Sequence, residues 1–298
     1  MKSDTLVKIG NLTLSSPDKV LYPEDRITKL DYAKYLLEIG PRLLVHVKRR
    51  LISLVRCPDG QAGECFFQRH ILRGFSAAVK TFDRPDKSEP FLYIDSMAGL
   101  MGLAQMNVLE IHIWGSHIDT LEKPDRMVFD LDPADNVTFA TVKEGALRVQ
   151  EVLGALGLKS YPMLSGGKGI HVVVPLMPTH SWDTVKEFSG ALASRMAADQ
   201  PERYVDTMTK SKRPGKIFID YFRNDRTATA IAPYSARARV GAPLAWPIRW
   251  DELPEFKSAN QVTMKNYTKY LKAEPWKGSA NLRQQIKPAA AAALGIKL

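Results

Sequence analysis

The chain has 298 residues, 45% of them hydrophobic and 25% charged, and its 42 Lys and Arg outnumber 32 Asp and Glu to give a net charge of +10. A chain of this length buries a large core, and its ordinary composition excludes a disordered, collagenous or low-complexity polypeptide. The apolar runs are too short to span a membrane and the N-terminus lacks the apolar stretch of a secretory signal, so we expect a cytoplasmic protein without membrane contact.

The spacing of apolar residues alternates between strand and helix periods, which predicts an α/β (α+β) fold with helices packed on a mixed sheet. In chain order, short strands are expected over 6–14, followed by a helix that Thr28 caps and that Gly40 and Pro41 end. Strands are then predicted over 51–55, 91–94, 108–113, 127–131, a segment ending at 164, 170–176 and 217–222, and helices over 139–156, 185–196 and 258–271.

The chain shows neither an internal repeat nor a long linker. We therefore expect a single domain over 1–298, with an N-terminal α/β subdomain over 1–90 and a core over 91–298. The tail from Lys287 is predicted to be a weakly attached helix or a frayed end. Cys57 and Cys65 lack CxxC spacing and a nearby histidine pair, which excludes a disulfide scaffold or a zinc module and suits a reducing compartment.

The excess positive charge is unevenly placed. Residues 81–140 hold 4 Lys and Arg against 11 Asp and Glu, whereas residues 1–80 hold 14 against 8 and residues 201–240 hold 9 against 4. A polyanion is drawn to the basic flanks and repelled by the acidic segment unless cations intervene. Many soluble proteins are equally basic, so the charge favours a nucleic acid ligand without establishing one.

Two aspartates, Asp130 and Asp132, lie two residues apart at the end of a predicted strand, so both side chains share one face of the sheet. Neighbouring carboxylates repel each other, and the arrangement is costly unless a cation neutralises them. Oxygen ligands of this kind suit Mg²⁺ or Mn²⁺, and Pro133 ends the strand where such a site would lie. The alternative is a strand end that begins a turn, with Asp135 and Asn136 capping the next helix.

A third aspartate, Asp220, interrupts a run of strand-forming residues. An acid in a buried strand needs a partner or a cation, which makes Asp220 a candidate third metal ligand. The alternative is a structural ion pair between Asp220 and Arg223 or Lys216.

Residues 165–171 have the sequence SGGKGIH and lie between two predicted strands. Glycines allow successive backbone N–H groups to turn inward, and Ser165, Lys168 and His171 add donors, which is typical of a nest for phosphate oxygens. The segment is not a Walker A loop, because Gly169 follows the lysine and a strand comes next. The alternatives are a plain glycine hairpin with an exposed lysine and, for His171, a hydrogen-bonded group of the core.

The order of these motifs, DLD, then SGGKGIH, then a strand with a lone Asp, resembles the archaeo-eukaryotic primase superfamily. The chain is most similar to the polymerase domain of bacterial ATP-dependent DNA ligase D, and the resemblance covers nearly its whole length. It implies an RRM-like catalytic sheet joined to the N-terminal subdomain. Further matching strings are DKVLYP at 18–23, FFQRH at 66–70, LEIHIWGS at 109–116, PDRMVFDLDP at 124–133 and KIFIDYFRN at 216–224.

The resemblance also implies roles for individual residues. Asp130, Asp132 and Asp220 would be catalytic and would bind two divalent ions, Mn²⁺ or Mg²⁺. The loop over 84–89 falls where family members carry a protruding element that helps to bring DNA ends together. The implied nucleotide ligands are Ser165, Lys168, His171, Arg237 and Arg239 at the phosphates, His112 near the sugar, and Phe66 and Phe67 at the base, while Lys19 and Lys29 would grip the 5′-phosphate of the downstream strand.

Ordinary explanations compete with each of these roles. Adjacent aromatic residues in a strand put one ring into the core, a histidine in a strand is often buried and hydrogen-bonded, and lysines are often solvated. These three explanations apply in turn to Phe66 and Phe67, to His112, and to Lys19 and Lys29. Arg237 and Arg239 alternate along one predicted strand face. Their alternative partners are Asp225 and Glu202.

The resemblance implies a DNA repair polymerase, a nucleotidyltransferase that adds nucleotides, preferentially ribonucleotides, to primer 3′ ends at gaps and double-strand breaks in non-homologous end joining. Its implied substrates are nucleoside triphosphates (NTP or dNTP) and broken or gapped DNA. Ligase and phosphoesterase domains of the same native chain and the end-binding protein Ku are the implied partners, in a bacterial cytoplasm near the nucleoid. Two alternatives stay open: a metal-dependent nuclease and a non-catalytic DNA end-binding module.

Overall fold

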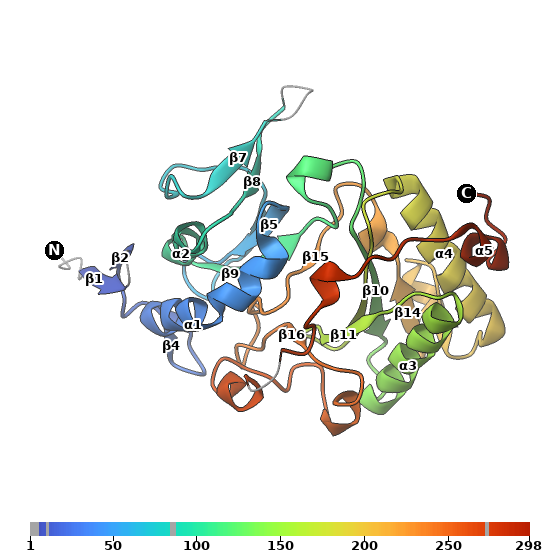
Figure 1. Ribbon diagram of the computed structural model, residues 1–298. Coiled ribbons are helices and arrows are strands. Elements are labelled where there is room, and N and C mark those ends of the chain that lie inside the picture. The colour runs from blue at the N-terminus through green and yellow to red at the C-terminus, as the bar shows by residue number, and fades with distance from the viewer. Residues whose placement is uncertain (1–5, 10–11, 84–87, 272–273) are drawn as a thin grey trace. The chain divides into compact units, whose positions relative to one another are not determined.

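The computed structural model describes residues 6–9, 12–83, 88–271 and 274–298 and has a mixed α/β fold, as predicted (Figure 1). The chain forms two compact units. Unit one takes its described residues from 1–113, 231–245 and 262–269, and unit two takes them from 114–230, 246–261 and 270–298. Of the loop predicted over 84–89, residues 84–87 lie outside the described residues.

Unit one is built on a sheet with strand order β15-β9-β5-β8-β7, in which β6 also pairs with β5. Its two long strands, β5 (Leu51–Arg56) and β9 (Val108–Ile113), are antiparallel neighbours at the positions that the sequence predicts. The shorter strands are β1 (Leu6–Ile9), β2 (Leu12–Ser15), β3 (Val20–Tyr22), β4 (Ile27–Thr28), β6 (Phe66–Gln68), β7 (Lys80–Phe82), β8 (Phe91–Tyr93) and β15 (Ala230–Ile231).

Helix α1 (Lys29–Val47) begins at the predicted cap, where the Thr28 hydroxyl accepts from the backbone N–H of Asp31 and the Asp31 carboxylate accepts from the N–H of Thr28. The prediction that Pro41 ends this helix is wrong. A proline removes one backbone donor, and the buried side chains of the last turns outweigh that loss. Helix α2 (Met97–Gln105), which the sequence analysis missed, packs on α1.

Unit two contains a second sheet with strand order β13-β14-β10-β12-β11-β16. Its central strand, β10 (Arg126–Pro133), is antiparallel to both of its neighbours, β12 (Ile170–Pro175) and β14 (Ile217–Asp220). The strand predicted over 217–222 ends at Asp220, because Phe222–Asn224 turns into a short 3₁₀ helix. The remaining strands are β11 (Tyr161–Leu164), β13 (Tyr204–Val205) and β16 (Trp246–Pro247).

Helices α3 (Phe139–Ala155) and α4 (Trp182–Asp199) pack on the sheet of unit two, as the sequence predicts. A Cβ atom at Gly145 of α3 would lie 3.1 Å from the side chains of both Leu131 and Ile217, so these residues face the helix. The tail forms helix α5 (Pro288–Ala293), with Ala290 and Ala291 buried. No helix in the described part of the chain has the length and apolar character needed to cross a membrane.

The predicted helix over 258–271 is wrong: only Tyr267–Tyr270 forms a short 3₁₀ helix. The backbone of this segment pairs instead with residues 242–244, because Leu244 donates to the carbonyl of Val262 and Met264 donates to the carbonyl of Ala242. These long-range hydrogen bonds are incompatible with a helix over the same residues.

The two cysteines form a disulfide between Cys57 and Cys65, eight residues apart, which corrects the expectation of reduced thiols. Cys57 follows β5 and Cys65 precedes β6, whose register places Arg56 opposite Phe66. The disulfide therefore continues the pairing of this hairpin by one position. It closes a loop in which the backbone N–H of Gln61 donates to the carbonyl of Leu21 in β3.

Candidate active site

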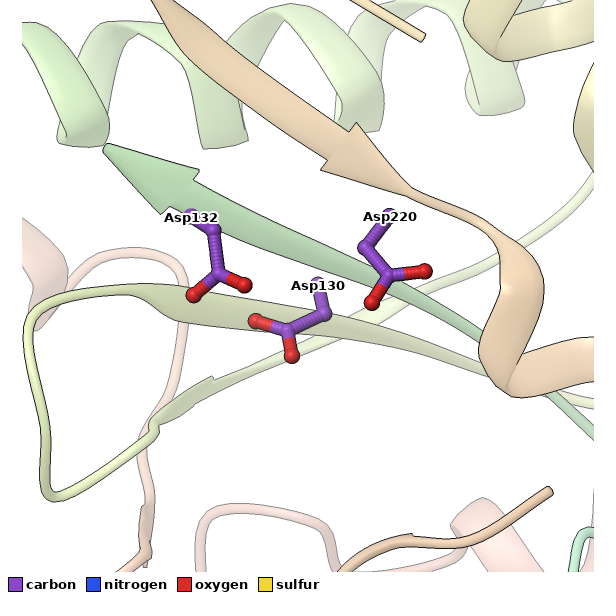
Figure 2. Close-up of side chains that lie close together, drawn as sticks. All are labelled: Asp130, Asp132 and Asp220. Atoms are coloured by element: carbon purple, nitrogen blue, oxygen red, sulfur yellow. The ribbon is translucent and has the colours of Figure 1, made fainter. Parts of the chain in front are cut away.

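Three aspartates converge on one face of the unit two sheet. In β10, Asp130 lies directly opposite Asp220 of β14, and Asp132 follows two residues later on the same face. Each of the three offers a carboxylate oxygen, and these oxygens lie within 4.8 Å of one another. Figure 2 shows the three side chains projecting from two neighbouring strands toward a common space. Their convergence, which the sequence analysis predicted, follows from the antiparallel register and the two-residue period of a strand.

The side chains of His171 and Arg223 border the aspartates. His171 of β12 lies opposite Asp130 on the other side of β10, and its Nε2 is 3.2 Å from Asp130 Oδ1. Arg223 reaches back from the 3₁₀ helix that follows β14, with Nη2 3.1 Å from Asp220 Oδ2 and Nε 3.6 Å from Asp130 Oδ2. The alternative of an Asp220–Arg223 ion pair is therefore present in the structure together with the aspartate cluster.

Burial dominates the electrostatics of this cluster. It raises the pKa of Asp132 to about 7, with a further increase from the charge of Asp130. Burial also raises the pKa of Asp220. For Arg223, burial lowers the pKa, but the charges of the three aspartates outweigh it and leave the pKa raised. The crowding of the carboxylates thus opposes their ionisation, which a bound cation would favour.

This donor set fits divalent ions that prefer oxygen. Asp130 and Asp220 are 7% and 6% exposed, so their carboxylates are largely desolvated. A bound cation would relieve the repulsion by the Asp130 charge, which contributes to the raised pKa of Asp132 and of Asp220. Three carboxylates and no cysteine in the cluster suit Mg²⁺ or Mn²⁺ better than a thiolate-preferring ion. Asp130, Asp132 and Asp220 are the residues that would hold them.

The SGGKG segment is a hairpin loop between β11 and β12, next to the aspartates. The Ser165 hydroxyl oxygen accepts from the backbone N–H groups of Gly167 and Gly169, both at 3.2 Å, and Gly166 donates to the carbonyl of Ala259. The N–H groups of these three glycines therefore have partners within the chain, and their role as a phosphate nest stays a prediction. The exposed Lys168 ammonium lies 2.5 Å from Asp135.

A second group of predicted residues lies in unit one, on β9 and on the segment after β15. His112 Nε2 is 2.8 Å from Glu110 Oε2, and Arg237 Nε is 3.1 Å from Glu110 Oε1. Arg237 thus has a partner in Glu110 that the sequence analysis did not consider. Arg237 and Arg239 do not alternate along a strand, because Arg239 lies in an exposed bend where its N–H donates to the carbonyl of Arg237.

The aromatic pair in β6 faces solvent. Phe66 and Phe67 are 37% and 67% exposed, so neither ring enters the core, contrary to the competing explanation. The Phe67 ring centroid lies 5.8 Å from that of His112, and the Arg56 guanidinium lies over the Phe66 ring. Exposed aromatic rings next to cationic groups are typical of surfaces on which bases stack.

The two predicted phosphate-binding lysines differ from each other. Lys19 is partly exposed and lies 3.5 Å from Asp59 of the disulfide-closed loop. Lys29 is only 3% exposed, which contradicts the expectation of a solvated lysine, and no carboxylate among the described residues pairs with it. Burial, and secondarily the charge of Lys19, lowers the pKa of Lys29 to about 8.

The structure thus assembles Asp130, Asp132, Asp220, Ser165, Lys168 and His171 within unit two, and Phe66, Phe67, His112, Arg237, Arg239, Lys19 and Lys29 within unit one. Glu110 was not among the residues predicted from the sequence. Its signal is an acid two residues from His112 in an otherwise apolar strand, the same pattern that singled out Asp130 and Asp132.

Comparison with known proteins decides the family. The family model of the LigD primase-polymerase domain matches residues 28–276. The chain belongs to the LigD primase-polymerase family. It is 36% identical to the multifunctional non-homologous end joining protein LigD of Pseudomonas aeruginosa over 292 residues. This similarity covers 96% of this chain and 35% of that protein. The bifunctional LigD of Bacillus subtilis is 29% identical over 81% of this chain and 39% of that protein.

The fold agrees with this assignment to the LigD family. The solved structure of the polymerase domain from Mycobacterium tuberculosis ligase D, in complex with DNA, matches with a TM-score of 0.82 and 29% identity and covers 92% of this chain and 99% of that one. The chain spans about a third of the length of the LigD relatives named above. As a member of the LigD primase-polymerase family, it is a nucleotidyltransferase, and the resemblance inferred from the motifs is confirmed.

Proposed function

We propose that this chain, as one primase-polymerase domain over 1–298, extends primer 3′ ends at gaps and double-strand breaks during non-homologous end joining, with a preference for ribonucleotides. The observation that carries the proposal is the convergence of Asp130, Asp132 and Asp220 within 4.8 Å on one sheet face. Two divalent ions at such carboxylates lower the pKa of an attacking hydroxyl and neutralise the charge that develops on the phosphates.

The side chains around the aspartates position the phosphates. Lys168, on a loop directly beside β10, is exposed and free to exchange Asp135 for a phosphate oxygen. His171, whose Nε2 lies 3.2 Å from Asp130 Oδ1, contacts the triphosphate next to the metal ligands. Ser165 fixes the loop through its two accepted hydrogen bonds, so its part in nucleotide binding is to hold Lys168 in place.

The residues of unit one contact the remaining parts of the substrates. Phe66 and Phe67 stack on a base, and stacking of this kind contributes about 1 to 3 kcal/mol per base. His112 contacts the sugar, and Arg237 with Arg239 contacts the phosphates. Lys19 and Lys29 bind the 5′-phosphate of the downstream strand. The buried Lys29 ammonium, which has no carboxylate partner in the part of the chain that the structure describes, is suited to this.

The partners follow from the relatives. The LigD proteins are named as multifunctional or bifunctional end joining proteins, and the M. tuberculosis polymerase domain is in complex with DNA. We infer that gapped or broken DNA is the substrate here, that ligase and phosphoesterase domains accompany this domain in its native chain, that Ku recruits it, and that it works in the cytoplasm at the nucleoid.

Extension of a 5′-phosphorylated gap tests the proposal. Asp130→Asn and Asp132→Asn should abolish extension with Mn²⁺ or Mg²⁺, because these carboxylates bind the ions. The affinity for the gapped DNA should stay within about twofold, because DNA binding does not require these carboxylates. Asp183→Asn, at an exposed position in the first turn of α4, is the matched control and should retain full activity. Retained extension in Asp130→Asn would falsify the assignment.

The same assay separates the two alternatives. Shortening of the labelled primer with Mn²⁺ in the absence of nucleotides indicates a nuclease. Tight DNA binding without metal-dependent nucleotide affinity in calorimetry indicates a non-catalytic end-binding module. Running the extension with NTP and with dNTP, and with each ion separately, measures the sugar preference and the metal preference directly.

A further inference from the structure

Glu110 is a charged residue inside an apolar strand, and the catalytic chemistry described above gives it no role. It lies in β9 and is 6% exposed, and its neighbours Leu109 and Ile111 are fully buried. A buried carboxylate is costly unless its oxygens are fully paired. A Glu110 carboxylate in the middle of the sheet therefore needs hydrogen-bond donors or a cation that stabilise its negative charge.

The two carboxylate oxygens of Glu110 hold two different elements. Oε2 lies 2.8 Å from Nε2 of His112, two residues away on the same face of β9. Oε1 accepts from the backbone N–H of Ala238 at 2.8 Å and lies 3.1 Å from Nε of Arg237. One side chain thus joins the strand that carries His112 to a segment 128 residues later in the chain.

The segment that carries Arg237 has little regular structure of its own. Its bonds include a bridge between Ala236 and Leu244, the Tyr22 hydroxyl, which donates to the carbonyl of Arg237 at 3.0 Å, and the backbone N–H of Arg237, which donates to the carbonyl of Pro243. Glu110 adds a charged anchor to this segment.

The charge of Glu110 is secure at neutral pH. Burial alone raises the pKa of this carboxylate, but the hydrogen bond from His112 and the charge of Arg237 together lower the pKa to about 2. An ionised carboxylate only accepts hydrogen bonds, so His112 must place a proton on Nε2. In a neutral ring the lone pair is then on Nδ1.

We propose that Glu110 is a positioning residue for the nucleotide: it fixes the Nε2–H tautomer and orientation of His112 and at the same time anchors Arg237, so that the groups for the sugar and for a phosphate are preorganised by one carboxylate. The inference rests on the proposed function for the identity of the ligand. With Nε2–H held by Glu110, the Nδ1 edge of the His112 ring is the one that meets a sugar hydroxyl, and the Phe67 ring, 5.8 Å away, borders the same place.

The Glu110→Gln variant tests the proposal because it keeps the shape and inverts one hydrogen bond. The amide oxygen can still accept from Ala238, which leaves the amide NH₂ facing His112. Nε2 must then accept, and the ring proton moves to Nδ1. The Nδ1 atom changes from an acceptor into a donor. Glu24→Gln, at an exposed position of unit one, is the matched control.

Nitrogen chemical shifts of the His112 ring provide a readout that does not depend on polymerase activity. We expect the Nε2–H form in the unmodified protein and the Nδ1–H form in Glu110→Gln, with Glu24→Gln unchanged. An Nδ1–H tautomer in the unmodified protein would overturn the proposal, even if Glu110→Gln fails to fold.

Steady-state extension provides the second readout. In Glu110→Gln we expect the nucleotide KM to rise by about tenfold or more with kcat changed by less than about threefold, because lost preorganisation weakens binding. A Glu110→Gln, His112→Ala double variant should be little worse than His112→Ala alone, whereas additive losses would contradict action through His112. Kinetics of Glu110→Gln equal to those of Glu24→Gln, with Asp130→Asn inactive, would overturn this inference and leave the proposed function intact.

Discussion

Gly169 approaches the backbone of Leu131 so closely that a Cβ atom at position 169 would lie 2.2 Å from the Leu131 carbonyl oxygen. The contact joins the loop that carries Lys168 to the strand that carries Asp130 and Asp132. We expect Gly169→Ala to displace the loop, to lower the free energy of unfolding by about 1 to 3 kcal/mol and to weaken nucleotide binding. Thermal unfolding and the nucleotide KM in the extension assay measure both effects.

Gly154→Ala is the control for that substitution. Gly154 lies in α3 of the same unit, and a Cβ there would meet nothing within 4 Å. Alanine in a helix interior is favoured over glycine by about 0.5 to 1 kcal/mol, so this variant should be slightly more stable and fully active. Equal stability of the two variants would contradict the proposed tight approach.

The stability of the metal-free protein should depend on Asp132. Its pKa is about 7 in the folded protein against an ordinary value of 3.8. The folded state therefore binds this proton more tightly than the unfolded chain, so the contribution of Asp132 to stability falls as the pH rises from about 4 through about 7. With a chelator present, the melting temperature of Asp132→Asn should fall less over this range than that of the unmodified protein.

Arg223 should compete with the divalent ions. Its guanidinium contacts both Asp130 and Asp220, so Arg223→Ala removes a cation that the metal-free site uses. We expect the metal-free variant to lose about 1 kcal/mol of stability, since the side chain is partly exposed. Added Mn²⁺ should raise its melting temperature by more than it raises that of the unmodified protein. An equal or smaller rise would show that the arginine does not occupy the position of a cation.

The affinity for a 5′-phosphate should follow the protonation of Lys29. Its pKa of about 8 means that the ammonium loses its proton between pH 7 and 9, whereas a phosphate monoester is already doubly charged there. The preference for 5′-phosphorylated over 5′-hydroxyl gapped DNA should therefore shrink over this range. Lys29→Arg should abolish the pH dependence and Lys34→Met, at an exposed site of α1, should leave it unchanged. Fluorescence anisotropy at several pH values measures this preference.

The disulfide should stabilise the hairpin that carries the aromatic pair. Replacing Cys57 and Cys65 together by serine should lower the free energy of unfolding by about 2.5 kcal/mol, which chain entropy predicts for a short loop. Dithiothreitol should produce a similar loss in the unmodified protein and none in the double variant. Unchanged unfolding of the unmodified protein under reducing conditions would contradict the prediction.

The aspartate cluster was accessible from the sequence because strand geometry is local. Asp130 and Asp132 share a face by their spacing alone, and a lone acid in a buried strand such as Asp220 calls for a cation wherever that strand lies. The order of the motifs DLD, SGGKGIH and the strand with Asp220 then indicated the LigD primase-polymerase family. The helix start at Thr28 was equally local, since its capping pattern occupies four residues.

The failures of prediction lie where distant segments meet. Pro41 is an ordinary helix breaker, yet α1 continues because its last turns are buried. The segment around Val262 reads as a helix but pairs with residues 242–244. The pairing of Glu110 with Arg237 depends on a return of the chain to β9 after more than a hundred residues, which no local pattern encodes. Tertiary contacts outweigh local propensity in each case.

The register that sets Asp130 opposite Asp220 has a consequence for how the protein folds. A slip of β14 by one residue would turn Asp220 toward the helices and scatter the three oxygens. The proposed site for divalent ions can therefore form only after these two strands have paired in their native register. In a refolding experiment, the time at which paramagnetic Mn²⁺ begins to quench a probe near the aspartates would report when β10 and β14 pair in this register.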